Sequence, residues 1–123
     1  MKISELTTER AADVLCEVSI YALNILSDKE LLASLRMQLE GTDGERTKAE
    51  LIAIASEKVA ELVPLLLKKH KDDVFGIVAA VNGLTLEQVR QQKIIKTMNA
   101  IKEMAQDKDL IDFFKSCVST EKA

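Results

Sequence analysis

Apolar residues recur at steps of three and four along most of this sequence, which is the spacing of one face of an α-helix. The first stripe predicts a helix that begins at Thr7 or Thr8 and runs through Ser19 with a bend there. Its apolar members are Ala11, Val14, Leu15, Val18, Ala22, Ile25 and Leu26. A second stripe predicts a helix that ends by Gly41, where the sequence GTDG marks a loop. Its members are Leu31, Leu32, Leu35 and Leu39.

Helix starts are marked by capping boxes, in which a hydroxyl residue is followed three positions later by Glu or Gln. Three tetrapeptides fit this pattern: SDKE at 27–30, TKAE at 47–50 and TLEQ at 85–88. Asp107 or Asp109 is expected to begin one more helix near the end. No segment shows a sustained period-two alternation, so the sequence predicts no β-sheet.

The middle of the chain is unusually apolar. The helix that starts near Thr47 carries LIAIA at 51–55, which is apolar on all sides, so we expect it to be central and buried on several sides. Pro64 predicts either a kink or a new helix with proline in its first turn. The basic run KKHK at 68–71 is expected to close that helix, because positive side chains in a last turn favour the helix dipole.

The remaining sequence predicts three more helices. A short one runs from 72 to about 81 and ends at the cap sequence Asn82-Gly83, and a long one runs from about 86 to 105. The apolar residues of the long helix are Val89, Ile94, Ile95, Met98, Ile101, Met104 and Ala105. Those of the last helix are Leu110, Ile111, Phe113, Phe114 and Cys117. The predicted fold is all-α, a compact bundle of five to seven helices built as one domain from residues 1–123, with a polar tail from about 119.

Composition and charge narrow the function classes. A chain of 123 residues with 47% apolar and 30% charged residues fits one globular domain, and only 3% aromatic residues predicts an aliphatic core. The net charge of −3 argues against general nucleic-acid binding, which needs a surplus of Lys and Arg. We find no signal peptide and no apolar run of membrane-spanning length. We therefore expect a cytoplasmic protein.

Residues that carry chemistry are sparse. His70 has Asp72 and Asp73 nearby but no second His or Cys at ligand spacing, so we expect a surface histidine at a helix end. Cys16 and Cys117 are expected to be buried or half-buried free thiols, and acidic neighbours make Cys16 a poor nucleophile. Glycines are single and scattered. We therefore expect no catalytic residue, no metal and no cofactor, and a protein that is not an enzyme.

One segment, 75–93, carries an alternative function as a helix-turn-helix DNA-binding regulator. The residues at the required spacing are Ala79, Gly83 and Val89. Two polar residues, Asn82 and Gln92, occupy positions where apolar packing is expected. The second helix offers Arg90 and Lys93 for phosphate or base contacts. Nucleic acid is therefore kept only as the second candidate partner.

Adjacent aromatic rings near the end of the chain suggest a binding surface. On a helix, Phe113 and Phe114 point about 100° apart, so one ring can enter the core while the other anchors a partner. The alternative, which we favour, is that both rings seal the end of the bundle. Phe75 is expected in the core, and Gly76 would let another helix approach closely.

Three segments of the sequence resemble tail assembly chaperones of long-tailed, siphovirus-like bacteriophages, of the kind found in prophages of Gram-positive bacteria. They are KISELTTERAADVLCEV at 2–18, LVPLLLKKHKDDVFGIVAAVNGLTLEQV at 62–89 and DLIDFFKSC at 109–117. The resemblance implies a small, acidic, helical protein of the bacterial host cytoplasm that coats the tape measure protein before the tail tube polymerises. Such a protein is absent from the mature virion.

The same resemblance implies further properties. The tail tube protein is a second candidate partner, self-association into rings or filaments is left open, and a longer product can arise by ribosomal frameshifting. The family has no site motif to carry over, so we assign binding to surfaces. The candidates are Phe113, Phe114 and, on the helix at 74–80, Val74, Ile77 and Val78. An apolar stripe of a helical client would pack against such edges.

Overall fold

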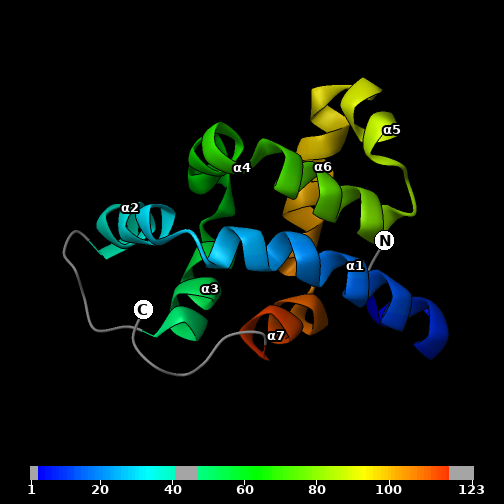
Figure 1. Ribbon diagram of the computed structural model, residues 1–123, viewed down its shortest axis with the longest axis horizontal. Helices are drawn as coiled ribbons and strands as arrows, with labels where there is room; N and C mark the ends of the chain where they lie inside the picture. The colour runs from blue at the N-terminus through cyan, green and yellow to red at the C-terminus, as the bar shows by residue number, and fades with distance from the viewer. Residues whose placement is uncertain (1–2, 41–46, 117–123) are drawn as a thin grey trace.

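The computed structural model describes residues 3–40 and 47–116, and these residues contain seven α-helices and no strand (Figure 1). This confirms the predicted all-α fold. The GTDG loop, the polar tail and Cys117 lie outside the described residues. The elements are η1 (Ile3–Glu5), α1 (Thr8–Leu26), α2 (Lys29–Glu40), α3 (Lys48–Glu57), α4 (Val59–Asn82), α5 (Leu86–Gln91), α6 (Ile94–Gln106) and α7 (Lys108–Ser116).

Side-chain caps set most of the helix starts, as the sequence predicts. Thr7 caps α1, and Thr47 and Thr85 each form a complete capping box at the start of α3 and α5. The predicted box at Ser27 is wrong by one residue. Ser27 still donates its backbone N–H to Leu23, so it ends α1, and the carboxylate of Asp28 caps α2 instead by accepting from the Leu31 N–H at 3.0 Å.

Of the two breaks in the central helices, the sequence pattern located one. α3 ends and α4 begins at Lys58, upstream of Pro64, which lies inside α4, so the prediction of a break at Pro64 is wrong. The basic run does contain a break, as predicted: at His70, with φ −134° and ψ 41°, the helical backbone is interrupted, and α4 consists of two helical halves joined by a kink. The second half of α4 ends as predicted at Gly83, whose φ of 67° is readily adopted only by glycine.

The predicted single helix from 86 to 105 is wrong, because the chain turns a corner at Gln92 between α5 and α6. The backbone of Gln92 is extended, with ψ 161°. Its side-chain amide donates to the hydroxyl of Thr97 at 2.9 Å, and Thr97 is 2% exposed. The side chain of Gln92 thus supplies a hydrogen-bond partner for a buried hydroxyl, and this bond accompanies the break between the two helices.

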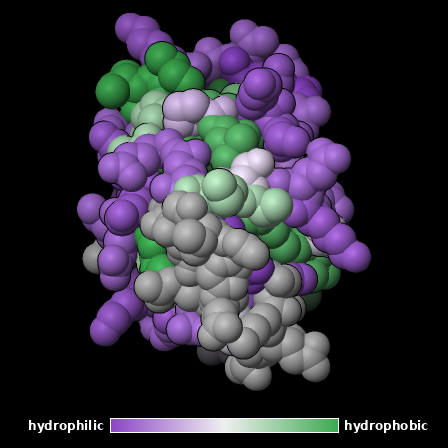
Figure 2. All heavy atoms as spheres, turned by 90° about the vertical axis from the view of Figure 1, so that its left-hand side faces the viewer, coloured by the Kyte–Doolittle hydropathy of each residue, from purple (hydrophilic) through white to green (hydrophobic). Residues whose placement is uncertain are grey.

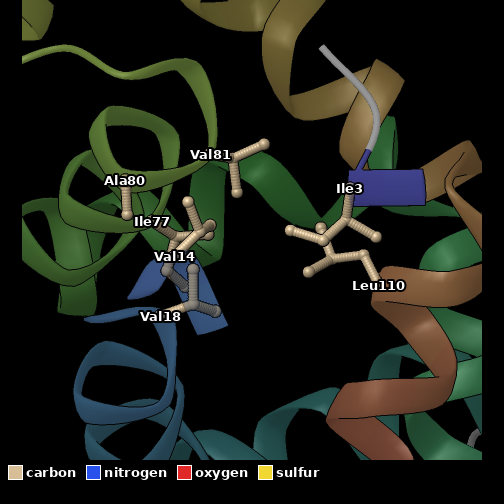
Figure 3. Close-up of a cluster of buried hydrophobic side chains, with 7 residues drawn as sticks. All are labelled: Ile3, Val14, Val18, Ile77, Ala80, Val81 and Leu110. Carbon is tan, nitrogen blue, oxygen red and sulfur yellow. The ribbon is translucent and has the colours of Figure 1, made fainter. Parts of the chain in front are cut away.

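The most extensive helix contact joins α1 to α4, and its close approach lies in the second half of α4. A Cβ added to Gly76 would collide with the ring of Tyr21, so the two helices approach as predicted because Gly76 has no side chain. This contact forms the cluster in Figure 3, where side chains of α1 and α4 face one another and Ile3 lies beside Leu110 of α7. The cluster contains Ile3, Val14, Val18, Ile77, Ala80, Val81 and Leu110.

Two further aliphatic clusters complete the core. One joins α4 to α5 and α6 through Val63, Val74, Val78, Ala79, Val89 and Ile101. The other joins α2 to α4 through Leu31, Leu32, Leu35 and Leu62. The expectation that α3 is buried on several sides is wrong: of its apolar run, Leu51 is buried and the residues at 52–55 are half-buried. α3 packs mainly against α7, and its other sides are less covered.

A buried carboxylate joins the two ends of the described chain. Asp107, which is 4% exposed, caps α7 by accepting from the Leu110 N–H at 3.4 Å, which confirms Asp107 as a helix start. Its other oxygen accepts from the N–H of Ile3 at 2.7 Å. The carboxylate therefore holds η1 against the start of α7.

We predict that Gly76→Ala lowers the free energy of unfolding by about 1–3 kcal/mol, because the new methyl group forces the Tyr21 ring from its packed position. In an ordinary helix interior the same change stabilises by up to about 1 kcal/mol. Urea unfolding checks the sign. The chain has one tyrosine and no tryptophan, so intrinsic fluorescence reports on Tyr21 directly. In a Tyr21→Ala background the penalty should disappear; an equal penalty there would contradict the proposed contact.

Candidate functional site

One hollow in the described part of the chain has a volume of about 190 Å³, is partly open to solvent and is lined by apolar side chains; we call it the apolar cavity. Six helices contribute to its wall, namely α1, α2, α3, α4, α6 and α7. Its lining includes Ile25, Leu35, Leu51, Val74, Ile77 and Phe114. The wall of the cavity is almost entirely hydrocarbon.

The structure places the predicted binding residues around this cavity rather than on an open edge. Val74, Ile77 and Val78 are 7%, 8% and 0% exposed, so they belong to the core, because α1 and α6 cover that side of α4. Val74 and Ile77 line the cavity. Phe114 lines it too, and the ring of Phe113 lies beside it with the two ring centres 6.2 Å apart. Both rings are half-buried and pack against the core cluster that contains Ile3 and Leu110. The two rings thus cover this end of the bundle.

Large apolar side chains are exposed elsewhere, which the sequence analysis missed. They occur as adjacent or near-adjacent pairs on α1 and α6 and singly on α2. The exposed fractions are 62% for Ile20, 50% for Leu23, 59% for Met37, 63% for Ile94 and 62% for Ile95. On α1 the signal was present, because Ile20 and Leu23 are out of step with the buried stripe at 14, 18 and 22. Figure 2 shows apolar side chains reaching the surface between polar ones on the face where α2 lies.

His70 is not the isolated surface residue that the sequence predicted. Its Nδ1 lies 2.8 Å from a carboxylate oxygen of Asp73, and its Nε2 lies 2.7 Å from one of Asp28. The other oxygen of Asp73 accepts from the side-chain amide of Asn24 at 3.0 Å. His70 therefore connects the bend of α4 to the junction of α1 and α2. We call this group the histidine clasp.

The histidine clasp favours the charged imidazolium. Burial opposes the charge on His70, but the hydrogen bonds and charges of Asp73 and Asp28 outweigh it, so the pKa of His70 is raised. The backbone N–H of Leu31 and the bond to His70 lower the pKa of Asp28. Both ring nitrogens face carboxylates, and both can donate only when the ring is protonated. The arrangement binds a proton and holds two elements together.

No metal or nucleophile site emerges from the described residues. Among residues 3–40 and 47–116, no group of three or more His, Cys, Asp or Glu side chains is arranged to hold a metal ion. Cys16 is exposed, so the expectation that it is buried or half-buried is wrong. The buried face of α1 passes through Val14 and Val18, and Cys16 lies midway between them on the other side of the helix.

The helix-turn-helix candidate keeps the predicted spacing, and one of its two basic residues, Arg90, is engaged in an ion pair, whereas Lys93 is exposed. Ala79 and Val89 are buried, and Gly83 makes the turn between α4 and α5. The second helix has six residues, and the guanidinium of Arg90 lies 3.0 Å from a carboxylate oxygen of Asp72. Asn82, which with Gln92 departs from the apolar pattern of a helix-turn-helix, donates its side-chain amide to the backbone carbonyl of Val78.

Comparison with protein-family models, with curated proteins and with solved structures found no match. No helix in the described ranges combines the length and the apolar character needed to cross a membrane.

We predict that the free energy of unfolding falls as the pH rises from about 6 to about 8.5. A raised pKa for His70 means that the clasp contributes fully below the ordinary histidine pKa of about 6.5 and is lost as the pH passes the folded-state value. The lowered pKa of Asp28 acts in the opposite direction, and its contribution is lost in acid. Urea unfolding across this range measures the trend.

His70→Gln provides the control, because it removes the titrating group and leaves every other ionisable side chain in place. The difference in stability between wild type and His70→Gln should shrink as the pH rises. A difference that stays constant from pH 6 to pH 8.5 would contradict an ionised clasp.

Proposed function

We propose that this protein is a non-enzymatic tail assembly chaperone of a long-tailed bacteriophage, which binds the tape measure protein and keeps it soluble before the tail tube polymerises. The bacterial host cytoplasm is then its place of action, and the mature virion lacks it. The resemblance of segments 2–18, 62–89 and 109–117 motivates this proposal. The all-α fold agrees with it.

The observation that carries the proposal is the exposure of large aliphatic side chains on a protein with an acidic surface balance. Ile94 and Ile95 are 63% and 62% exposed at the start of α6, and Ile20 and Leu23 are at least half exposed on α1. The net charge is −3. Exposed aliphatic groups of this kind can cover the apolar stripe of a helical client, while the charge keeps the assembly dispersed.

A chaperone of this kind needs only weak contacts. Several copies along one extended client give high overall occupancy although each copy binds modestly, and modest binding allows release when the tube forms. The described part of the chain suits this role because its exposed large apolar side chains are distributed over α1, α2 and α6. The DNA-binding alternative has less support, because Arg90 is engaged by Asp72 and α5 is short.

The direct test is co-expression with the tape measure protein encoded in the same gene cluster. We expect the client to aggregate alone and to be recovered soluble, in complex, when this chain is present. A titration with duplex DNA at low salt, run on the same preparation, should show no binding. An unaffected client and no complex would overturn the proposal, and salt-sensitive binding to the duplex would support the helix-turn-helix alternative.

A second prediction locates the client surface on α6. The double variant Ile94→Ser, Ile95→Ser should weaken client binding by at least about tenfold, because each isoleucine loses roughly 1.5–3 kcal/mol of burial in the complex. The matched control is Lys96→Ser, Asn99→Ser, which changes two exposed polar positions of the same helix and should bind like wild type. Exposed positions tolerate such changes, so circular dichroism should find both variants folded. Equal retention of the client by both would exclude this surface.

A further inference from the structure

We propose that the histidine clasp is a pH-dependent latch on the first turn of α2: a protonated His70 holds this turn against α4, and a neutral His70 releases it. The latch acts below the level of overall unfolding, because one element separates while the other helices stay packed. It does not depend on the chaperone function, since its contacts lie within this chain.

The latch works because both nitrogens of one ring face carboxylates. The Nδ1 of His70 lies 2.8 Å from Asp73 and its Nε2 lies 2.7 Å from Asp28, and the side chain of His70 is 12% exposed. A protonated ring donates to both carboxylates, whereas a neutral ring has one N–H and can donate to only one. Once the proton is lost, the other nitrogen presents its lone pair to a carboxylate oxygen, and that contact becomes repulsive.

Asp28 is the partner that the neutral ring loses. Asp73 lies three positions after His70, so short-range chain geometry keeps these two side chains together, and Asn24 of α1 also donates to Asp73 at 3.0 Å. Asp28 has no such constraint, because it lies 42 positions away, between α1 and α2. Its side chain is 28% exposed, so water can replace the ring as its partner. Deprotonation therefore breaks the link between α4 and the start of α2.

The polar contacts beside the clasp hold the first turn of α2 weakly. Glu30 lies 3.5 Å from the ammonium group of Lys69, but the side chain of Glu30 is 86% exposed, so solvent screens this pair. The bond from the side-chain amide of Gln38 to the carbonyl of Glu61 lies near the other end of α2. The first turn can therefore separate while the far end of α2 stays attached.

Release of the first turn would uncover leucine side chains. Leu31 is 0% exposed and Leu32 is 7% exposed, and both pack in the cluster that contains Leu62 of α4. Asp28 also accepts from the Leu31 N–H at 3.0 Å, so a movement of Asp28 is transmitted directly to this turn. Figure 1 shows α2 at one end of the bundle. Its movement there leaves the contact between α1 and the second half of α4 in place.

The charges on both sides of the contact set the direction of the switch. They are Asp73 and Lys69 on α4, Asp28 before α2 and Glu30 in its first turn. The two carboxylates that face the ring outweigh the effect of burial, so the pKa of His70 is raised. The latch is therefore closed below the ordinary histidine pKa of about 6.5 and opens as the pH rises through the folded-state value.

The single histidine of the chain makes the test direct, because one ring signal in an NMR titration reports its protonation. Between about pH 5.5 and about pH 9, the methyl NOEs that link the first turn of α2 to Leu62 should weaken at least about twofold, with the midpoint of the His70 ring. The NOEs between Val14 and Ile77 in the other cluster should stay constant. Constant α2 NOEs while the ring titrates would overturn the proposal. So would equal weakening in both clusters, since the whole bundle would then be responding.

Asp28→Asn separates the latch from the cap. Asparagine still caps a helix, but its amide can accept from the protonated ring and donate to the neutral one, so the pH response of the α2 NOEs should disappear. The matched control, Glu30→Gln, removes an exposed charge from the same turn and should respond like wild type. His70→Gln, which has no titrating ring, should also lose the response. A wild-type response in Asp28→Asn or His70→Gln would overturn the latch, as would loss of the response in Glu30→Gln.

Discussion

The contact between Gly76 and the ring of Tyr21 sets the geometry on which the bundle depends. Because Gly76 offers no side chain, α1 lies close enough to the second half of α4 for Val14 and Val18 to pack directly against Ile77. A larger residue would push the helices apart and open the main core cluster. η1 and α7 then close one side of this pair, and α5 and α6 pack on the other side of α4. The bundle is therefore organised around one close helix crossing rather than around a central aromatic layer.

The bend of α4 at His70 determines which helices pack against each half of α4. A straight helix would carry both halves of α4 along one line, whereas the bent helix packs α2 against its first half and α1 against its second. The histidine clasp joins the bend to Asp28, which also caps α2, so one charged group fixes a bend, a cap and a helix junction together. The apolar cavity lies in the space that these differently directed helices leave between them. α3 and α7 cover this space without filling it, which explains why the apolar run of α3 stays half-buried.

Local features were predictable from the sequence, and long-range ones were not. The caps at Thr7, Thr47 and Thr85 depend on residues three positions apart, so a short window of sequence contains the whole interaction. The bond between His70 and Asp28 joins residues 42 positions apart, and no local pattern indicates it. The break at Gln92 is not predictable from local sequence for a related reason. Helix propensity favours a continuous helix there, whereas the hydrogen bond from Gln92 to the buried Thr97 hydroxyl forms with the chain bent at Gln92. A cavity lined by six helices is harder still to predict from sequence, because its lining residues follow no common sequence spacing.

The distribution of apolar groups bears on how such a protein would act on a partner. Val74, Ile77 and Val78 were expected on a binding edge because the segment is apolar, but that same apolar character is what places it in the core. The side chains left for a partner are those out of step with the buried stripes, such as Ile20 on α1 and the Ile94–Ile95 pair at the start of α6. Side chains this exposed gain little burial on folding, so they contribute little to the stability of the bundle, and that gives a reason to look for a partner there. Because these groups lie on the surface of the bundle, covering them requires no rearrangement of the core, and a partner that packs against them would leave the fold unchanged.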